Sequence, residues 1–131
     1  MDMGLMGQGA VVLFMDMEDP VAHDDWHSHE HLPERLGIPG FLRGRRCVTT
    51  DAGAPRYFVL YEVRDCAVTT SQPYLDRLNA PTPWTAKTMA TIRYMSRTLC
   101  RVAASFGSGV GGHLLVVRLA PTAEGGEGLR A

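Results

Sequence analysis

The sequence predicts an α+β domain whose elements follow one another in the order β-α-β-β-α-β. Short apolar runs, rich in β-branched and aromatic residues, stand at 9–17, 41–49, 57–63 and 93–104. Stretches with helix-start signals separate the first run from the second and the third from the fourth. At 131 residues the chain is long enough for one domain with a hydrophobic core of its own.

The first half of the chain is expected to form one strand and one helix before the second strand begins. Residues 9–17 (GAVVLFMDM) are apolar at nearly every position, as in a buried strand. Asp19 and Pro20 supply an N-cap and a first-turn proline, so a helix is expected from Pro20. Pro33 is expected to kink or end that helix, and the turn signal GIPG at 37–40 follows it.

The second half is expected to add two strands and two shorter helical segments. Residues 57–63 (YFVLYEV) have the aromatic and branched composition of a strand. A short helix is expected at 71–78, and the proline-rich segment 79–84 must be irregular. Residues 85–92 are expected to add another helical turn or two, and 93–104 alternate well enough for the fourth strand.

This order of elements is the ferredoxin-like split βαβ arrangement, which puts helices on one face of an antiparallel sheet. The other face needs a cover, and a symmetric partner is the simplest one, so we expect a homodimer. The domain spans residues 9–104, and 105–131 form a C-terminal extension. Within it, 111–120 (GGHLLVVRLA) predict a fifth strand similar to the first. That strand begins a truncated second repeat, pairs with another subunit, or resembles the first by coincidence.

Composition and charge argue against several classes of function. A net charge of −1 gives no broad attraction to nucleic acid or to an anionic membrane. No apolar run is long enough to span a bilayer, and the N-terminus lacks the pattern of a signal peptide. The 3 cysteines are far apart, unlike those of a disulfide framework or a zinc knuckle. We therefore expect a cytoplasmic protein with no nucleic-acid partner and no membrane contact.

A cluster of histidines in the window 26–34 (WHSHEHLPE) is the most informative chemical feature. Histidine titrates near neutral pH and is the commonest metal ligand, so the cluster indicates proton transfer or metal binding. On an ideal helical wheel His29 falls in the apolar arc, whereas His23 and His27 form part of a flank expected to be solvated. His27 and His31 have the i, i+4 spacing of a metal pair, but no third ligand stands nearby, so no metal is expected.

His29 and His31 are therefore the candidates for acid/base catalysis. His29 lies on the core side of the predicted helix, while His31 stands just before a proline expected to bend the chain toward the sheet. Burial and a carboxylate such as Glu30 are able to tune the pKa of such a histidine. The alternative for His29 is a core histidine bonded to a backbone carbonyl.

Arginines and aromatic residues supply the candidate binding groups. Arg43 and Arg46 point to opposite faces of the second strand, and either is suited to an oxyanion. The alternative for these arginines is ion pairing at a sheet edge or a dimer interface. Trp26, Tyr61 and Trp84 are expected to wall a pocket for an aromatic ligand.

The spacing of these residues resembles a known family. After the first strand come W-x4-HLPER from Trp26 and IPGF-x4-R from Ile38, followed by LYE at 60–62 and PTPWT at 81–85. Over 9–104 this pattern is similar to the dimeric α+β-barrel superfamily, and within it to the EthD-like group of largely uncharacterised bacterial proteins. The resemblance implies a ferredoxin-like protomer, a dimer and a pocket between the sheet and the helices. It also implies that the functional histidine is His31, where the helical wheel favours His29.

Three functions are compatible with these residues and this resemblance. The first is a small cofactor-independent enzyme of the dehydratase, cyclase or isomerase type, acting on an aromatic or polyketide-like molecule through His31 or His29. The second is a non-catalytic small-molecule-binding or stress-associated barrel. The third is a cofactor-free monooxygenase or a metal- or haem-associated barrel that uses His27 and His31. The sequence favours a lyase or isomerase without deciding the reaction or the substrate.

Overall fold

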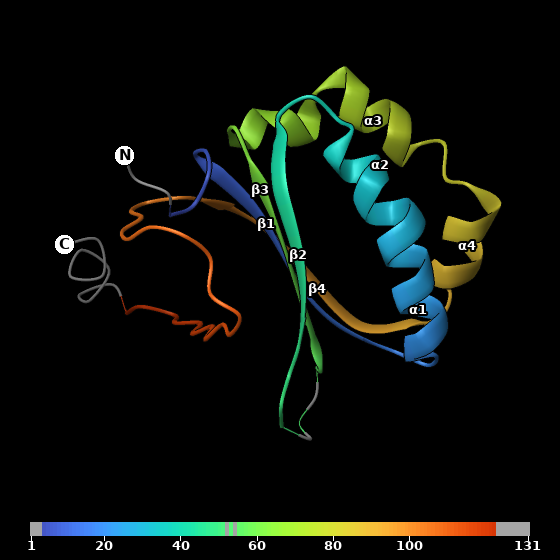
Figure 1. Cartoon of the computed structure of the whole chain (residues 1–131). Helices are drawn as coiled ribbons and strands as arrows, with labels where there is room; N and C mark the ends of the chain where they lie inside the picture. Colours follow the sequence, from blue (N-terminus) through green and yellow to red (C-terminus); the bar gives the residue numbers. More distant parts are fainter. Residues whose placement is uncertain (1–3, 52, 54, 123–131) are drawn as a thin grey trace.

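The computed structural model describes residues 4–51, 53 and 55–122, which form a four-stranded antiparallel sheet with helices packed on one face (Figure 1). The strand order is β2-β3-β1-β4. The two central strands are β1 (Gly9–Met17) and β3 (Tyr57–Val63), and the edge strands are β2 (Phe41–Val48) and β4 (Ile92–Arg101). The predicted α+β class and ferredoxin-like order are confirmed.

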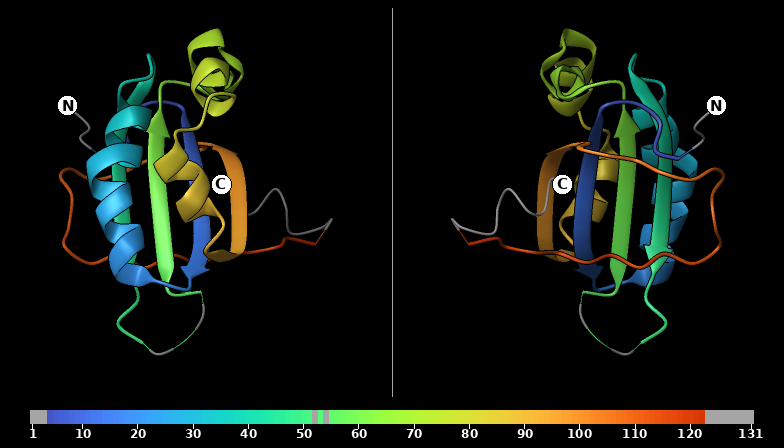
Figure 2. Two further views of the ribbon diagram at one scale, coloured as in Figure 1. Left: turned by 90° about the vertical axis from the view of Figure 1, so that its right-hand side faces the viewer. Right: turned by 90° about the vertical axis from the view of Figure 1, so that its left-hand side faces the viewer.

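The helices all lie on the same side of the sheet (Figure 2). They are α1 (Pro20–Trp26), a π-helical turn (His27–His31), α2 (Leu32–Leu36), a 3₁₀ helix (Cys66–Thr70), α3 (Gln72–Leu78) and α4 (Pro83–Met89). The first three segments follow one another without a break and form one long helix. None of the helices in the described part of the chain has the length and apolarity that a membrane crossing requires.

The long helix runs through Pro33 instead of ending there. Asp19 caps its start by accepting a hydrogen bond from the Ala22 N–H at 3.1 Å. The N–H of Leu32 bonds to the carbonyl of His27, five residues back, which is the π pattern. Pro33 has no N–H to donate, so the helix changes its hydrogen-bond pattern in the turn before it and then continues to Leu36.

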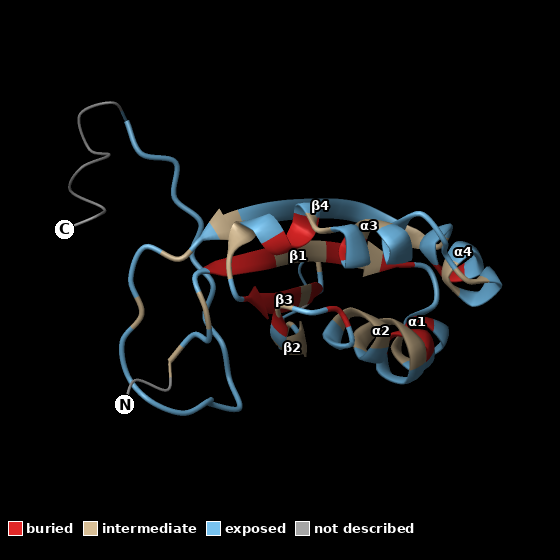
Figure 3. Cartoon of the chain, turned by 90° about the horizontal axis from the view of Figure 1, so that it is seen from above, coloured by how far each residue is buried: buried red, intermediate tan, exposed pale blue. Residues whose placement is uncertain are grey.

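The core lies between the sheet and these helices. Alternate residues of β1 point toward the helices, and β3 is buried along almost its whole length, as Figure 3 shows. The buried apolar cluster comprises Val11, Met15, Met17, Ile38, Phe41, Tyr57, Val59, Tyr61, Val63, Val68 and Tyr74. Burial of these side chains on the helix side fixes which residues of each strand face the opposite side.

The opposite side of the sheet carries no helix among the described residues, and we call it the open face. Its centre is formed by Phe14 and Phe58, which are opposite one another in the register and have ring centroids 5.2 Å apart. At one end of this face Arg43 forms an ion pair with Glu62. The segment after β4 crosses in front of the open face (Figure 2, right) and places the Arg118 guanidinium 4.1 Å from the centroid of the Phe14 ring.

The predicted fifth strand at 111–120 is not formed, and residues 102–122 contain no strand. The N–H of Val102 still bonds to the carbonyl of Gln8 at 2.9 Å. The chain then loops away from the sheet (Figure 1), so its backbone makes no ladder with either edge strand. A strand needs such a partner, and this segment lies across the open face instead of beside the free edge of β2 or β4 (Figure 2, right). The part of the extension beyond Thr122 lies outside the described residues.

Candidate functional site

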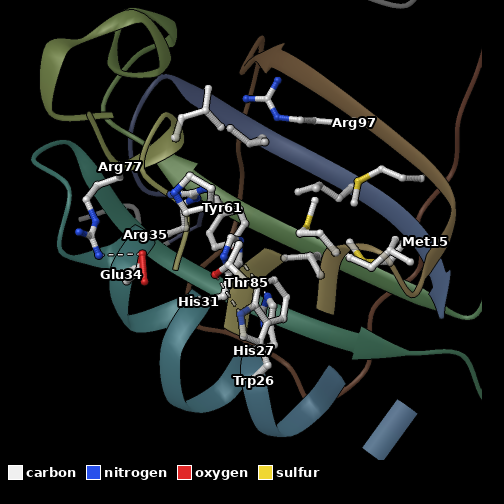
Figure 4. A pocket seen from close by; sticks show the side chains of 18 of the residues that line it. Met15, Trp26, His27, His31, Glu34, Arg35, Tyr61, Arg77, Thr85 and Arg97 are labelled. Atoms are coloured by element: carbon white, nitrogen blue, oxygen red, sulfur yellow. Dashed lines mark hydrogen bonds and ion pairs between the residues drawn. The ribbon is translucent and has the colours of Figure 1, made fainter. Parts of the chain in front are cut away.

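A cavity of ≈ 360 Å³ lies between the helix-covered face of the sheet and the helices (Figure 4). Its floor is apolar and is contributed by β1, β3, β4 and α4. The apolar residues of the floor include Val11, Leu13, Met15, Val59, Met89, Ile92 and Met95. Most of the polar side chains lie on the walls, which include His27, His31 and Tyr61 and the arginines around them. A cavity of this size and lining suits a small, largely apolar molecule.

The histidines at 23, 27 and 31 form a stripe along the wall of the cavity. His23 and His27 are only 1% and 2% exposed, so the expectation that they are solvated is wrong. Their rings are stacked with centroids 5.6 Å apart, and the His27 and His31 rings are also 5.6 Å apart. The spacing i, i+4, i+8 keeps all three on one side of the helix.

Trp26 positions His31 and is itself held by a small network of hydrogen bonds. The rings of Trp26 and His31 are stacked with centroids 4.4 Å apart. The indole N–H lies 3.1 Å from both Glu30 Oε2 and Thr85 Oγ1, and the hydroxyl of Thr82 donates to Glu30 Oε2 at 2.8 Å. Glu30 therefore ties the π-turn to the start of α4 instead of pairing with a histidine.

His31 presents a free imidazole to the cavity. No described residue forms a hydrogen bond with its ring, and one face of the ring is covered by Trp26. Burial, followed by the nearby positive charge of Arg35, lowers the pKa of His31 from 6.5 to about 3. The neutral imidazole is thus a weak proton acceptor. Its pKa should rise when a negative charge lies next to Arg35.

His27 is engaged at both ring nitrogens. Arg46 Nη1 lies 2.7 Å from Nδ1, and Nε2 lies 3.1 Å from the hydroxyl of Tyr61. Burial, followed by the charges of His31 and Arg46, lowers the pKa of His27 to about 3. The described residues contain no group of three or more metal-binding side chains arranged to hold an ion. With both nitrogens occupied, the geometry gives no support to a metal held by His27 and His31.

The structure does not bring His29 to this site. Its side chain is 71% exposed, and its Nδ1 lies 2.9 Å from Asp25 Oδ1 on the solvent side of the helix. The helical wheel was centred on apolar residues that are in fact exposed, such as Val21 at 81% and Leu36 at 38%. Trp26 and the histidine stripe lie on the buried side of the helix instead. His31, the residue that the family resemblance indicated, therefore faces the cavity.

The predicted binding residues are divided between the cavity and other surfaces. Trp26 and Tyr61 line the cavity, as predicted. Arg43 points to the open face, where Glu62 binds it, so it cannot line this cavity. Arg46 lies behind the histidine stripe and contacts His27 without lining the cavity. Trp84 is 38% exposed and points away, although the neighbouring Thr85 and Ala86 do line it.

Two arginines that were not predicted as site residues from the sequence also line the cavity. Arg97 of β4 donates to the hydroxyl of Tyr74 at 3.0 Å, and the Arg35 guanidinium lies 5.5 Å from the centroid of the same ring. Neither forms an ion pair with a carboxylate of the described residues, whereas Arg77 is paired with Glu34 at 2.7 Å. Strand alternation at Arg97 and the i+4 step from His31 to Arg35 were the signals that could have revealed them.

Comparisons with known proteins place the fold but not the family. A scan of protein-family models found no match, and a search of curated proteins found none either. HapK from Hahella chejuensis is 12% identical, with a TM-score of 0.51 over 80% of this chain and 99% of that one. A dimeric ferredoxin-like protein from an uncultured marine organism is 15% identical, with a TM-score of 0.53 over 74% and 96% of the two chains.

An EthD-family protein from Bacillus halodurans is also among the matched structures, at 15% identity and a TM-score of 0.48 over 72% of this chain and 97% of that one. The conclusion about the fold rests on the two closer superpositions, since identities this low carry information on architecture alone. The chain has the fold of the dimeric ferredoxin-like proteins, as the resemblance seen in its sequence implied.

Proposed function

We propose that this protein is an enzyme that moves a proton within a small, largely apolar molecule bearing an anionic group, with His31 as the acid/base. An aromatic or polyketide-like substrate has this character. The observation that carries the proposal is the free imidazole of His31, stacked on Trp26 and facing a cavity with an apolar floor. A titratable side chain without a hydrogen-bond partner on the wall of such a cavity is suited to proton transfer.

The unpaired arginines indicate that the substrate carries a negative charge. Arg35 and Arg97 line the same cavity as His31, and neither is neutralised by a described carboxylate. A carboxylate or phenolate of the substrate would pair with them. Such an anion also removes the positive field of Arg35 that lowers the pKa of His31. His31 therefore becomes a stronger base when the anionic substrate is bound.

Proton transfer through His31 would serve an isomerisation, a cyclisation or a dehydration. The neutral imidazole takes a proton from a carbon next to a carbonyl group, and the electron pair moves onto the carbonyl oxygen. The imidazolium then returns that proton to another carbon, which completes an isomerisation or follows a ring closure. In a dehydration it gives the proton to a leaving hydroxyl, which departs as water. No electron acceptor is required in any of these steps.

A second candidate is a binding protein without catalysis. The observation that favours it is the pKa of His31, which is lowered to about 3 by burial and leaves a weak base in the unliganded cavity. The apolar floor and the arginines would serve such a protein equally well. The two candidates differ in what His31 does once the ligand is bound.

The test compares His31→Ala with His29→Ala on a panel of aromatic and polyketide-like carboxylates and phenols. Product formation is followed by chromatography, ligand binding by calorimetry and folding by circular dichroism. We expect His31→Ala to remain folded, to bind and to lose turnover, while His29→Ala keeps full turnover because its side chain points to solvent. Turnover that survives in His31→Ala contradicts the proposed role. Binding without turnover in the unmodified protein favours the second candidate.

We further propose that a second copy of the chain covers the open face. Support comes from the apolar centre of this face at Phe14 and Phe58, which no described helix covers. The similar protein from the marine organism is described as dimeric, and it spans nearly the whole domain. The segment 111–120 would then have a strand edge of the partner within reach, in addition to the edges of its own chain.

A further inference from the structure

Four side chains from four elements form a connected line that ends at the cavity. Asp24 of α1 lies 3.2 Å from Nε of Arg46 of β2. Nη1 of the same guanidinium lies 2.7 Å from Nδ1 of His27 in the π-turn, and Nε2 of His27 lies 3.1 Å from the hydroxyl of Tyr61 of β3. Tyr61 lines the cavity beside His31 (Figure 4).

The direction of each hydrogen bond in this line follows from the arginine. A guanidinium has only donors and stays protonated, so His27 must accept from Arg46 through a bare Nδ1. The ring proton of neutral His27 is therefore on Nε2, and this N–H donates to the oxygen of Tyr61. Tyr61 accepts through its oxygen, and its own proton must be directed elsewhere.

We propose that the line Asp24–Arg46–His27 makes the hydroxyl of Tyr61 a fixed hydrogen-bond donor to an anionic or carbonyl oxygen of the ligand. The inference rests on the proposed function only in that both place the ligand in the same cavity. No described residue accepts the phenolic proton, so the cavity is where a partner for it can be placed. Tyr61 is thereby assigned a hydrogen bond to an oxygen atom of the ligand. His27 and Arg46 are positioning residues that act through Tyr61.

The surroundings keep both rings in the required protonation states. Burial lowers the pKa of His27, so it stays neutral and donates through one nitrogen only. Burial raises the pKa of Tyr61, so the phenol keeps the proton that it donates. A donor that is already oriented before the ligand arrives can stabilise negative charge on the ligand oxygen without reorganisation. The adjacent His31 is then free to exchange a proton with the ligand.

The first test reads the tautomer of His27 directly by long-range ¹H–¹⁵N NMR at neutral pH. We expect the unmodified protein to show the proton on Nε2 and a bare Nδ1. Arg46→Met should lose this preference, whereas Arg45→Met, a matched change one residue away on the other face of β2, should retain it. A protonated Nδ1 in the unmodified protein, or an unchanged tautomer in Arg46→Met, would overturn the inference.

The second test measures the affinity for 4-nitrophenolate, at a pH where the probe is ionised, by its absorbance change. Tyr61→Phe removes only the hydroxyl, and we expect it to weaken binding about 10-fold to 100-fold, as for a lost hydrogen bond to a charged group. Arg46→Met should weaken binding in the same direction by less, and Arg45→Met should not change it. Equal affinity in Tyr61→Phe, or no binding to the unmodified protein, contradicts the donor role.

The two tests separate this inference from the proposed function. If His27 has the expected tautomer and Tyr61→Phe weakens binding while His31→Ala keeps turnover, the donor role stands and the role of His31 fails. If His31→Ala loses turnover but the tautomer is the opposite one, the proposed function stands and the inference fails. Should Arg46→Met not fold, the spectrum of the unmodified protein and the Tyr61→Phe affinity still decide.

Discussion

The two faces of the sheet stabilise their buried polar groups in different ways. On the helix-covered face a buried polar group is the neutral ring of His27, held between Arg46 and Tyr61. On the open face the buried group is the Glu62 carboxylate, which is 1% exposed and is held by Arg43 and by the N–H of Met6. Burial lowers the pKa of the histidine on one face, whereas the hydrogen bond from Arg43 helps to lower that of the carboxylate on the other.

This difference follows from two adjacent residues of one strand. Tyr61 and Glu62 are neighbours in β3, and strand alternation sends them to opposite faces. The cavity wall holds one ion pair of its own, Glu34–Arg77, but Arg35 and Arg97 have no carboxylate partner among the described residues, so an anionic ligand still finds a free one. On the open face the Arg43–Glu62 pair instead holds the N-terminal segment, through the Met6 N–H and the Gly4 carbonyl. We therefore expect the two faces to respond differently to mutation and to pH.

The largest expected effect is on assembly through the open face. Phe14→Glu places a charge at the centre of this face, and a charge buried in an apolar interface is strongly unfavourable. We expect the unmodified protein to have twice the chain mass of 14.3 kDa by light scattering, and Phe14→Glu to be monomeric. Val21→Glu, at a position that is 81% exposed on α1, should leave the mass unchanged. A monomeric unmodified protein at micromolar concentration would refute the proposed dimer.

The next effect concerns the ion pair of the open face. Glu62→Ala leaves Arg43 without its partner, and we expect a loss of about 3 kcal/mol in the free energy of unfolding. This is the lower end of the range for a buried pair, since the Arg43 side chain is 25% exposed and can turn to water. The exposed pair of Glu18 and Arg93 supplies the control, and Glu18→Ala should cost less than about 1 kcal/mol. Urea unfolding curves that shift equally for both variants would show that Glu62 is not specially placed.

The sequence predicted the strands of both faces well because strand formation depends on local composition and alternation. The run of apolar residues in β1 and the branched and aromatic residues of β3 are signals that stand in the chain itself. The predicted division of Arg43 and Arg46 between the two faces also followed from alternation alone. The segment 111–120 has a comparable composition and still forms no strand, because strand formation also requires that the segment lie beside a sheet edge, and it does not run along β2 or β4.

The site was harder to predict because the buried side of a helix depends on its neighbours. Apolar Val21 is exposed and polar His23 is buried, which reverses the usual reading of a helical wheel. His23 is accommodated by aromatic contacts, with ring centroids 5.6 Å from Trp26 and 5.9 Å from Tyr57. Contacts that come from a distant strand leave no periodic signal in the helix. The family resemblance around His31 indicated the histidine that faces the cavity, whereas the helical wheel indicated His29. The resemblance reflects the contacts of the whole fold, and the wheel considers one helix alone.

A smaller effect for each residue is expected from mild acid, and it belongs to the helix-covered face. The folded pKa values of His27 and His31 are lowered from 6.5 to about 3, so below about pH 6.5 the unfolded chain binds more protons than the folded one. Stability is therefore complete above this pH and falls as the pH drops toward 3. At about pH 5 we expect a loss of about 2 kcal/mol for each histidine that stays neutral, measured by urea unfolding.

The open face should not contribute in the same range of pH. The pKa of Glu62 is lowered below its usual 4.5, so the stability that its ion pair gives is kept until the pH falls below that value. His23→Phe offers a matched variant, because its ring can keep the aromatic contacts while removing one buried histidine, whose pKa is also lowered by burial. We expect a shallower loss of stability between about pH 6.5 and pH 5. An unchanged slope would place the acid sensitivity elsewhere.

The smallest expected effect concerns the contact that the C-terminal segment makes with the open face. Arg118 lies over the Phe14 ring at 4.1 Å, and an exposed cation–π contact contributes about 0.5–1 kcal/mol. Arg118→Ala should lower the free energy of unfolding by no more than this, and Arg56→Ala, an exposed arginine with no aromatic partner among the described residues, should not change it. A much larger loss, accompanied by a change in mass, would mean that the segment acts between subunits and not within one chain. That outcome would make the open face an interface between two copies of the chain, to which the segment after β4 contributes.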